Sequence, residues 1–423
     1  MLDPKYIREN PEAVKDGIRK KMGEPALVDQ FLALDTERRT LQQATEARQA
    51  SLNLASTNMA QASPEERESL RADLRSLSDA IKVEQTALAE MDDAWLVLLR
   101  QIPNLPASDV PEGSSDKENV VVRTEGTRPT FSFAPQDHET LALKLDLLDM
   151  ERGAKVSGAK FYYLKNQLVL LEHAVMRFAM DTVQKQGFTL MTVPHMARAE
   201  AFYGAAHFST PEDAIEGDAY QLERDKLYLA GTAEIGLVNY RANEVLQSEE
   251  LPLRYAGISP CYRRESGTYG KETRGLYRVH QFQKVEMVSL VKPEDSIPEH
   301  ERLLGIAEEI LKSLGLHYQV VLNCGGDLGH PQVKKWDIEV WLPGMNKFGE
   351  THSCSNDTDY QARNLNIRYK NEEGKPVFVH TLNNTVLASP RILVALLENG
   401  QQEDGSITIP EILQPYTGFS QIS

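Results

Sequence analysis

The chain has 423 residues, a formal net charge of −16 and three cysteines. This length allows more than one domain, and the acidic charge argues against non-specific DNA binding while permitting an RNA recognised by shape. No long apolar stretch predicts a membrane span, no signal-peptide pattern opens the chain, and widely spaced cysteines favour free thiols, so we expect a cytoplasmic protein.

Four helices are predicted at the amino-terminal end. Asp3-Pro4 and Asn10-Pro11 each place a capping residue before a proline, which is typical of a helix start. Residues 26–60 contain no Gly or Pro, and Ser63-Pro64-Glu65-Glu66 is a capping-box pattern that begins a second long helix. Apolar residues of this helix follow heptad spacing at Leu70, Leu74, Leu77, Ile81, Leu88, Met91, Trp95 and Leu98.

The two long helices admit two arrangements. A dimerising coiled coil is the commoner use of heptads, whereas a short turn between the helices predicts an antiparallel hairpin whose outer faces stay free. The first helix is the less regular one, because Arg38, Thr45 and Arg48 interrupt its apolar positions. About 33 residues at about 1.5 Å per residue would make an arm about 50 Å long.

The remainder of the chain, from about residue 136, mixes long helices with β-rich segments and predicts an α+β domain. An apolar helix is expected over residues 168–185 and a strand over 188–193, followed by Pro194. Another strand over 227–230 leads into Gly231-Thr232-Ala233-Glu234, where a hydroxyl and a carboxylate could bind a small amino acid. Such a loop is by itself more often an ordinary turn.

Charged and aromatic residues are concentrated in the segment 278–286. In a strand, alternate side chains share a face, which would here carry Arg278, His280, Phe282, Lys284 and Glu286. A cation, an aromatic ring and a carboxylate on one face could hold a phosphate, a flat base and an ammonium group. A wet sheet face with one stray aromatic fits this segment, taken alone, equally well.

A second strand is predicted just upstream, over residues 261–265, with Arg263 and Glu265 on one face. The glycine-containing stretch 266–277 would join the two strands as a long hairpin loop. The neighbouring arginines favour a binding face over a merely solvated one.

Two later segments also carry candidate ligands. The alternating strand 336–341 precedes Glu350-Thr351-His352-Ser353, whose carboxylate and hydroxyl are hard oxygen ligands suited to Mg²⁺. His352-x-Cys354 alone is a weak zinc pattern, and a plain strand is preferred. Ser389 is predicted to cap a helix that runs from Pro390 to about Gly400, which places Arg391 in the first turn, where anions are favoured.

These motifs, in this order, resemble those of the class II aminoacyl-tRNA synthetases. Arg263-x-Glu265 and residues 274–282 are similar in sequence to motif 2 of the seryl-tRNA synthetases. The predicted helix and strand followed by Pro194 resemble motif 1, and residues 382–391 resemble motif 3. The resemblance implies an amino-terminal tRNA-binding domain (1–105) with an antiparallel coiled-coil arm (about 26–99), a linker (106–135) and a catalytic domain (136–423) built on an antiparallel sheet flanked by helices.

The resemblance also implies an activity and partners. The enzyme would be a ligase that activates L-serine with ATP to seryl-adenylate, with Mg²⁺, and transfers serine to tRNA(Ser) and also to tRNA(Sec). A homodimer through the motif 1 region is implied, with neither a membrane nor DNA as a partner.

Site residues follow from the same resemblance. It implies catalytic roles for Arg263, Arg278 and Arg391, and metal binding by Glu350 and Ser353. ATP would be bound by Arg263, Arg264, Glu265, Arg278, Val279, Phe282, Glu350, Thr351, His352, Ser353 and Arg391. Serine would be bound by Thr232, Ala233, Glu234, Arg263, Glu286, Asn383 and Thr385.

One departure concerns motif 3, where many bacterial members read Gly-Ser-Gly and this chain reads Asn384-Thr385-Val386. Three alternatives stay open: another class II synthetase, a homologue that aminoacylates a carrier protein, and a catalytically inactive RNA-binding paralogue. Threonyl and prolyl enzymes carry a carboxy-terminal anticodon domain, and the segment after Arg391 in this sequence is too short to form one. The carrier-protein homologue lacks the long arm, and Arg263, Glu350 and Arg391 argue against loss of catalysis.

Overall fold

The computed structural model describes residues 1–61, 63–265 and 274–423. The chain forms two compact units: a helical unit of residues 2–19 and 23–103, and a sheet unit of Met1, residues 20–22 and residues 104–423. Of the helices described, none combines the length and the apolar character needed to cross a bilayer.

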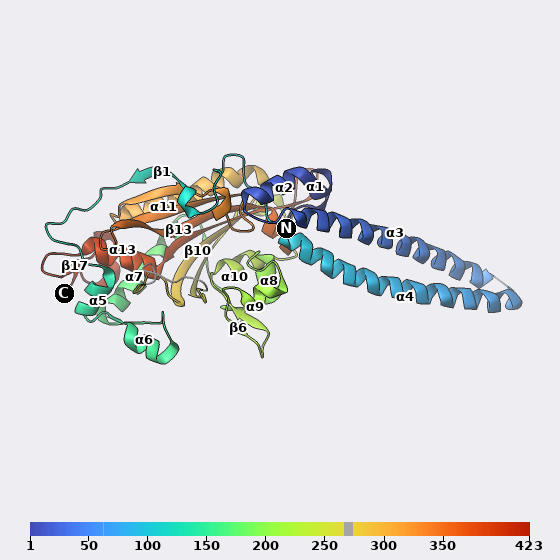
Figure 1. Cartoon of the computed structure of the whole chain (residues 1–423), viewed down its shortest axis with the longest axis horizontal. Coiled ribbons are helices and arrows are strands. Elements are labelled where there is room, and N and C mark those ends of the chain that lie inside the picture. The colour runs from blue at the N-terminus through green and yellow to red at the C-terminus, as the bar shows by residue number, and fades with distance from the viewer. Residues whose placement is uncertain (62, 266–273) are drawn as a thin grey trace. The chain divides into compact units, whose positions relative to one another are not determined.

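The helical unit contains the four predicted helices, α1 (Pro4–Glu9), α2 (Pro11–Lys20), α3 (Ala26–Gln61) and α4 (Pro64–Gln101). The Asp3 side chain accepts a hydrogen bond from the Lys5 backbone N–H, as expected of a helix cap. Helices α3 and α4 pack against each other as a hairpin within one chain (Figure 1). Of the predicted capping box at residues 63–66, the side chains of residues 64–66 lie outside the described part of the chain.

The hairpin is held by an apolar base and by polar pairs farther along. Near the base the rings of Phe31 and Trp95 lie 5.6 Å apart, and Ile81 is buried farther along. Arg38 pairs with Asp92, and Arg48 pairs with Glu84. The residues that interrupt the heptad pattern of α3 therefore meet acidic residues of α4, which favours one register of the two helices.

The sheet unit is built on eight strands in the order β1-β11-β12-β13-β16-β10-β9-β4. All neighbours are antiparallel except β4 and β9. The bounds are β1 (Val120–Glu125), β11 (Tyr318–Leu322), β12 (Lys334–Leu342), β13 (Lys347–Thr358), β16 (His380–Ala388), β10 (Gln281–Val291), β9 (Leu253–Tyr262) and β4 (Thr189–Thr192). The predicted α+β class with an antiparallel sheet is confirmed.

Three long helices pack on the sheet around one large core: α7 (Asn166–Lys185), α11 (Ser296–Ser313) and α13 (Ser389–Gly400). Val285 and Met287 of β10 belong to this core, whereas Lys284 and Glu286, which alternate with them along the strand, face a cavity. The period-two alternation of a strand thus separates core from cavity. The helix and the strand predicted around residues 168–193 are confirmed as α7 and β4.

Shorter elements surround this framework (Figure 1). The helices are α5 (His138–Lys144), α6 (Met150–Ser157), α8 (Ala199–Gly204), α9 (Pro211–Glu216), α10 (Glu234–Asn239), α12 (Tyr360–Leu365) and α14 (Gln414–Thr417). The strands are β2 (Leu148–Asp149), β3 (Tyr163–Leu164), β5 (Met196–Arg198), β6 (Gln221–Leu222), β7 (Leu227–Leu229), β8 (Val245–Leu246), β14 (Arg368–Lys370), β15 (Pro376–Phe378), β17 (Ile407–Thr408) and β18 (Gln421–Ile422).

Two local predictions are wrong. Ser389 is the first residue of α13 and does not cap it; instead its hydroxyl accepts a hydrogen bond from the Gln283 backbone N–H. Strand β9 ends at Tyr262 and β10 begins at Gln281, so neither strand extends as far toward the connecting loop as predicted. Glu265 already has a positive φ of 51°, which is incompatible with a continuing strand. The middle of the predicted hairpin loop, with Gly267 and Gly270, lies outside the described residues.

Candidate active site

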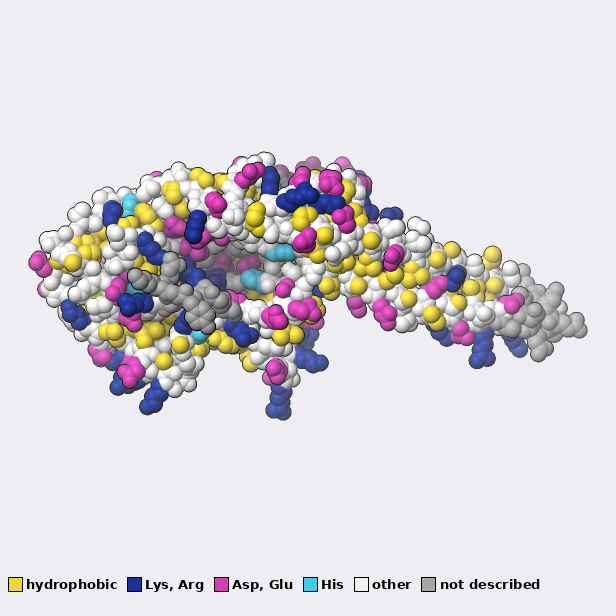
Figure 2. All heavy atoms as spheres, in the orientation of Figure 1, with side chains coloured by type: hydrophobic (Ala, Val, Ile, Leu, Met, Phe, Trp, Pro, Cys, Tyr) yellow, Lys and Arg dark blue, Asp and Glu magenta, His cyan; other side chains and the backbone are white. Residues whose placement is uncertain are grey.

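A cavity of about 370 Å³ opens on the sheet unit, over β10, β13 and β16. Figure 2 shows it as a hollow in which positively and negatively charged side chains gather. Its lining is formed by His207, Asp218, Thr232, Glu234, Arg263, Glu265, Tyr277, Arg278, Val279, Phe282, Lys284, Glu286, Gln332, Glu350, Thr351, Ser353, Ser355, Asn383, Thr385, Ala388, Pro390 and Arg391. So many charged groups in one hollow suit a polar, charged ligand.

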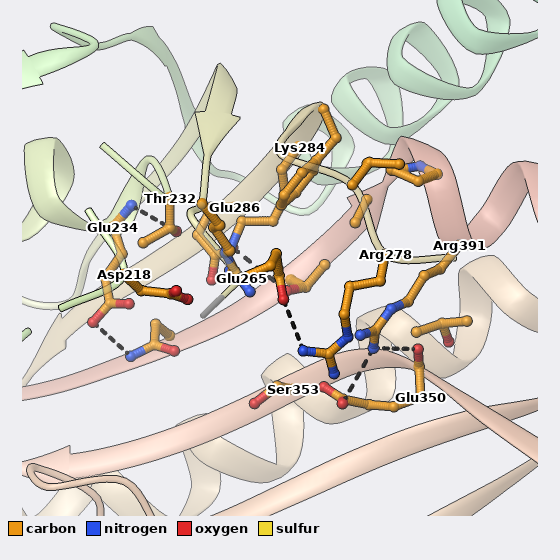
Figure 3. Close-up of a pocket in the computed structure, with 18 of the residues that line it drawn as sticks. Asp218, Thr232, Glu234, Glu265, Arg278, Lys284, Glu286, Glu350, Ser353 and Arg391 are labelled. Atoms are coloured by element: carbon orange, nitrogen blue, oxygen red, sulfur yellow. Dashed lines mark hydrogen bonds and ion pairs between the residues drawn. The ribbon is translucent and has the colours of Figure 1, made fainter. Parts of the chain in front are cut away.

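One end of the cavity is built around Glu234, the first residue of α10 (Figure 3). Its Oε1 accepts hydrogen bonds from Gln361 Nε2 at 2.8 Å and Asn383 Nδ2 at 3.1 Å, and His207 Nε2 lies 3.4 Å from its Oε2. Burial acts to raise the pKa of Glu234, but these hydrogen bonds and the His207 charge outweigh it and lower the pKa. The Thr232 hydroxyl accepts from the Glu234 N–H. A charged carboxylate is thereby kept beside a hydroxyl.

Glu286 supplies a second buried carboxylate. It pairs with Lys284, and its Oε2 lies 3.5 Å from the Thr385 hydroxyl. Burial raises the pKa of Glu286, and the charge of Lys284 opposes that rise. Because one lysine faces the two carboxylates Glu286 and Glu234, this part of the cavity can accept a further cation.

The other end of the cavity holds the arginines (Figure 3). Arg391 lies in the first turn of α13; one of its terminal nitrogens donates to the Glu350 backbone O at 2.7 Å and lies 3.2 Å from Glu350 Oε2. Arg278 donates to Glu265 Oε2 at 2.7 Å. Partial burial acts to raise the pKa of Glu350, but Arg391 and Lys335 hold it below its usual value. Two planar guanidinium groups at one end match a polyphosphate.

The cavity is also lined by an aromatic ring. The Phe282 ring faces the cavity from β10, and the guanidinium of Arg263 lies 5.4 Å from its centroid. Arg263 also donates from Nε to the Gly231 backbone O at 3.3 Å. A flat base could stack on this ring within reach of a positive charge.

The pairing of β12 with β13 explains why consecutive residues reach the cavity. The register shifts between Ile338 and Glu339, so Thr351 has no partner residue on β12. This bulge places Glu350, Thr351 and Ser353 on the cavity side. His352 points away: it is buried, and its Nε2 lies 2.9 Å from the Val386 backbone O.

Most residues that the sequence singled out meet in this one cavity, and three do not. Arg264 is exposed to solvent outside the lining, Ala233 is fully buried in a neighbouring core, and burial lowers the pKa of His352 to about 4 behind the strand. His280, expected on the same face as Phe282, turns toward Phe161, with 5.2 Å between ring centroids. It does so because the strand begins only at Gln281.

Several lining residues were missed by the sequence analysis. Lys284 is not one of them, because it was expected on the face that it shares with Phe282 and Glu286. Ser355 carried a signal, since it lies two residues beyond Ser353. No local pattern pointed to His207, Asp218 or Gln332. Three others lie within the segments similar to motifs 2 and 3 but were given no role: Tyr277, Ala388 and Pro390. His207 reaches Glu234 only because α8 packs on α10.

Neither the cysteines nor the acidic and histidine side chains form a metal-binding group by themselves in the described part of the chain. Cys261, Cys324 and Cys354 are free and buried. Among the described residues, no three His, Cys, Asp or Glu side chains form a metal-binding group. Any divalent cation in the cavity would therefore depend on ligand oxygens as well as on Glu350 and Ser353, as Mg²⁺ commonly does.

Comparisons with known proteins agree with this geometry. A family model described as the seryl-tRNA synthetase N-terminal domain matches residues 1–106, and the class II tRNA synthetase core domain (G, H, P, S and T) matches residues 219–400. Serine–tRNA ligases of Dictyoglomus thermophilum and Treponema denticola are 44% and 45% identical over 100% of this chain and 99% and 100% of theirs. The crystal structure of seryl-tRNA synthetase from Pyrococcus horikoshii complexed with ATP is similar with a TM-score of 0.91 and 39% identity, over 100% of this chain and 99% of that chain.

Proposed function

The chain belongs to the seryl-tRNA synthetase family of class II ligases, and from this premise we propose how its cavity joins serine to tRNA. The observation that carries the proposal is the division of one cavity into an acidic end, around Glu234 and Glu286, and an arginine end, around Arg278 and Arg391. An amino acid and a triphosphate, bound at these ends, would meet in the middle.

Serine occupies the acidic end. Its ammonium lies against Glu286 and Glu234, and its hydroxyl is held by Thr232, Asn383 and Thr385. A site that hydrogen-bonds a substrate hydroxyl rejects the analogue that lacks it, because its buried polar groups are left without partners. The same polar groups thus select serine over alanine.

ATP occupies the rest of the cavity. Its adenine stacks on Phe282 near Val279, with its amino group toward Glu265, and Arg263 holds the α-phosphate. Arg278 and Arg391 bracket the outer phosphates, for which their planar, two-pronged donors are suited. Thr351 lies along the same wall.

Magnesium fits the donors beside Arg391. The Glu350 carboxylate and the Ser353 hydroxyl are hard oxygen donors on the cavity side of β13. When bound there, Mg²⁺ would neutralise phosphate charge.

The first reaction is attack by the serine carboxylate on the α-phosphorus, in line with departing pyrophosphate, which yields seryl-adenylate. No side chain needs to act as a nucleophile, since positioning and charge stabilisation supply the rate. Arg263 stabilises the charge that develops on the α-phosphate. Transfer of the seryl group to the terminal adenosine of tRNA follows.

The two units of the chain have different roles, and the protein binds tRNA and a second copy of itself. Residues 1–105 form the tRNA-binding domain, with the α3–α4 hairpin as its arm, 106–135 a linker, and 136–423 the catalytic domain. The substrates are tRNA(Ser) and also tRNA(Sec), charged in the cytoplasm. Two copies associate through the region of α7 and β4.

Serine-dependent exchange of labelled pyrophosphate into ATP tests the proposal. We expect exchange with serine, and at least about a hundredfold less with alanine or threonine at equal concentration. The purified full-length chain is used, with the Arg263→Ala variant as the inactive control. Equal exchange with threonine, or none with any amino acid, would contradict the proposed activation step.

A further inference from the structure

A buried histidine outside the cavity contacts the segment that carries two of its lining residues. His138 lies in α5 and is 2% exposed. Its Nε2 accepts a hydrogen bond from the Leu276 backbone N–H at 3.1 Å. Tyr277 and Arg278 follow directly, and both line the cavity. The contact therefore holds the residue that immediately precedes the lining residues Tyr277 and Arg278 in the chain.

The partner of the other imidazole nitrogen is Glu398, which is fully buried. Glu398 Oε1 lies 3.0 Å from His138 Nδ1 and also accepts from the His138 backbone N–H at 3.1 Å, while Oε2 accepts from the Gly344 N–H at 2.9 Å. A backbone N–H can only donate, so Nε2 must be unprotonated and Nδ1 must carry the hydrogen. Glu398 thus selects the tautomer that can hold Leu276.

Glu398 belongs to α13, the same helix that supplies Arg391 two turns earlier. Arg391 in turn contacts the held segment: its guanidinium lies 4.9 Å from the centre of the Tyr277 ring, and its Nε lies 3.5 Å from the Tyr277 backbone O. One helix therefore meets the segment at two points, directly through Arg391 and indirectly through Glu398 and His138.

Gly275 makes the approach possible. Its φ is +55°, and a Cβ at this position would lie 2.4 Å from His138 Nε2. Any other residue would push the segment away from the imidazole. The backbone at Gly275–Leu276 is thus fitted to His138 both by shape and by a hydrogen bond.

We propose that His138, oriented by Glu398, is a positioning residue for ATP: it fixes the backbone before Tyr277 and Arg278 so that Arg278 and Arg391 lie together at the arginine end. The inference rests on the proposed function, since it takes those arginines as phosphate ligands. His138 itself touches no substrate, so its loss should weaken ATP binding and leave serine binding intact.

Two substitutions at position 138 separate the roles of its nitrogens. His138→Gln can place an amide oxygen near the Nε2 position and keep an acceptor for Leu276, whereas His138→Asn keeps only a group near Nδ1 for Glu398. In pyrophosphate exchange we expect His138→Asn to raise the KM for ATP about five- to tenfold, which is the effect of losing one well-placed hydrogen bond. The KM for serine should stay within about twofold, and His138→Gln should restore most of the ATP effect.

Gly275→Ala provides an independent approach to the same contact, with the imidazole intact. It should raise the KM for ATP similarly, and the Gly275→Ala/His138→Asn double variant should be little worse than either single variant, because both remove one contact. His317→Asn is the control: this histidine also bonds the backbone, with its Nδ1 donating to the Glu125 O at 2.9 Å, but it lies outside the cavity lining.

The outcomes distinguish this inference from the proposed function. Failure of the wild-type chain to exchange with serine would overturn the proposed function itself. Wild-type exchange with an unchanged ATP KM in His138→Asn, or an equal rise for ATP and serine, would overturn the positioning role alone. Thermal melting of each variant accompanies the kinetics, since a merely structural histidine would lower the Tm without splitting the two KM values.

Discussion

Two buried carboxylates of the cavity differ in how burial and neighbouring charges set their pKa values. Glu234 and Glu286 are both buried carboxylates, yet the pKa of Glu234 is lowered, by His207 and amide donors against its burial, while burial raises that of Glu286. Glu234 therefore stays charged over a wider pH range, and Glu286 is the carboxylate whose proton can affect binding in mildly acidic solution.

The first prediction concerns serine binding and Glu286. The charged form binds the ammonium and predominates above the pKa, so serine affinity should fall as the pH drops through the raised pKa of Glu286. Glu286→Ala should abolish serine activation while leaving ATP affinity within about threefold, because a charge-assisted contact is lost only at the ammonium. Calorimetric titration with serine and with ATP, repeated at several pH values, measures both effects.

The matched control for that titration is Glu286→Gln, which keeps the shape and cannot ionise. Its weak serine binding should show no acid-dependent loss. If the acid-dependent loss persists in this variant, the responsible group is not Glu286; if Glu286→Ala loses ATP and serine affinity equally, the residue has a structural role.

The second prediction concerns Arg391. Its guanidinium reaches the Glu350 backbone O, the Glu350 carboxylate and the Tyr277 backbone O from one planar group. A lysine keeps the charge but not the two-pronged geometry, so Arg391→Lys should lower kcat/KM for ATP about tenfold or more. Pyrophosphate exchange at varied ATP measures it, and wild-type kinetics in the variant would show that charge alone suffices.

At the scale of elements, the α3–α4 hairpin combines two kinds of contact. Its base is apolar, with Phe31, Leu99 and Ile102 fully buried, whereas Arg38 and Arg48 farther along pair with acids across the hairpin. The base also contacts α1, where Arg8 pairs with Asp35 at 3.1 Å. A cut from residue 26 to 99 would therefore remove most of this base and leave the buried residues of α1 and α2, such as Ile7 and Ile18, without their packing partners. A shorter deletion is the better test.

The third prediction uses that shorter deletion. Replacing residues 42–88 by a four-residue turn leaves the Phe31–Trp95 and Arg38–Asp92 contacts in place. Serine-dependent exchange should stay within about twofold of wild type, because activation uses only the sheet unit. Aminoacylation of tRNA should collapse, because the removed part is proposed to bind tRNA.

Two measurements complete this test. Wild-type aminoacylation should weaken as salt rises, as expected for contacts to the RNA backbone. The deletion variant is also examined by sedimentation, because loss of a dimer would identify the heptads as an intermolecular seam. Normal aminoacylation by this variant would show that the arm is not needed for tRNA binding.

At the scale of the whole molecule, the segment from α7 to β5 exposes apolar side chains and includes a strand at the end of the large sheet. Strand β4 ends the eight-stranded sheet as described, and its Leu190 is exposed. Leu170 of α7 and Met196 of β5 are also about half exposed. A sheet edge with exposed apolar neighbours is a typical contact surface between subunits.

The fourth prediction follows for the proposed homodimer. A Leu170→Glu/Leu190→Glu variant should sediment as a monomer, because two carboxylates would be buried without partners in the interface. Val83→Glu is the matched control, since Val83 is 70% exposed on α4, which belongs to the helical unit. An unchanged dimer in the double variant, or dissociation of the control, would locate the interface elsewhere.

The sequence by itself determined the elements and much of the chemistry. Heptad spacing, proline and capping residues predicted the four amino-terminal helices, and period-two alternation predicted that Phe282, Lys284 and Glu286 share a face, because both patterns are local properties of the backbone. The order of the motifs identified the family for the same reason: it is carried by short segments of chain.

Only the tertiary structure decided where the ends of these segments go. It ended β9 at Tyr262, gave Ser389 a hydrogen bond to Gln283 instead of a cap, and turned His352 away from the cavity through a bulge at Thr351. It also brought His207 to Glu234 and His138 to Leu276, across 27 and 138 positions. Strand register and packing between distant elements set these contacts, and no local periodicity encodes them.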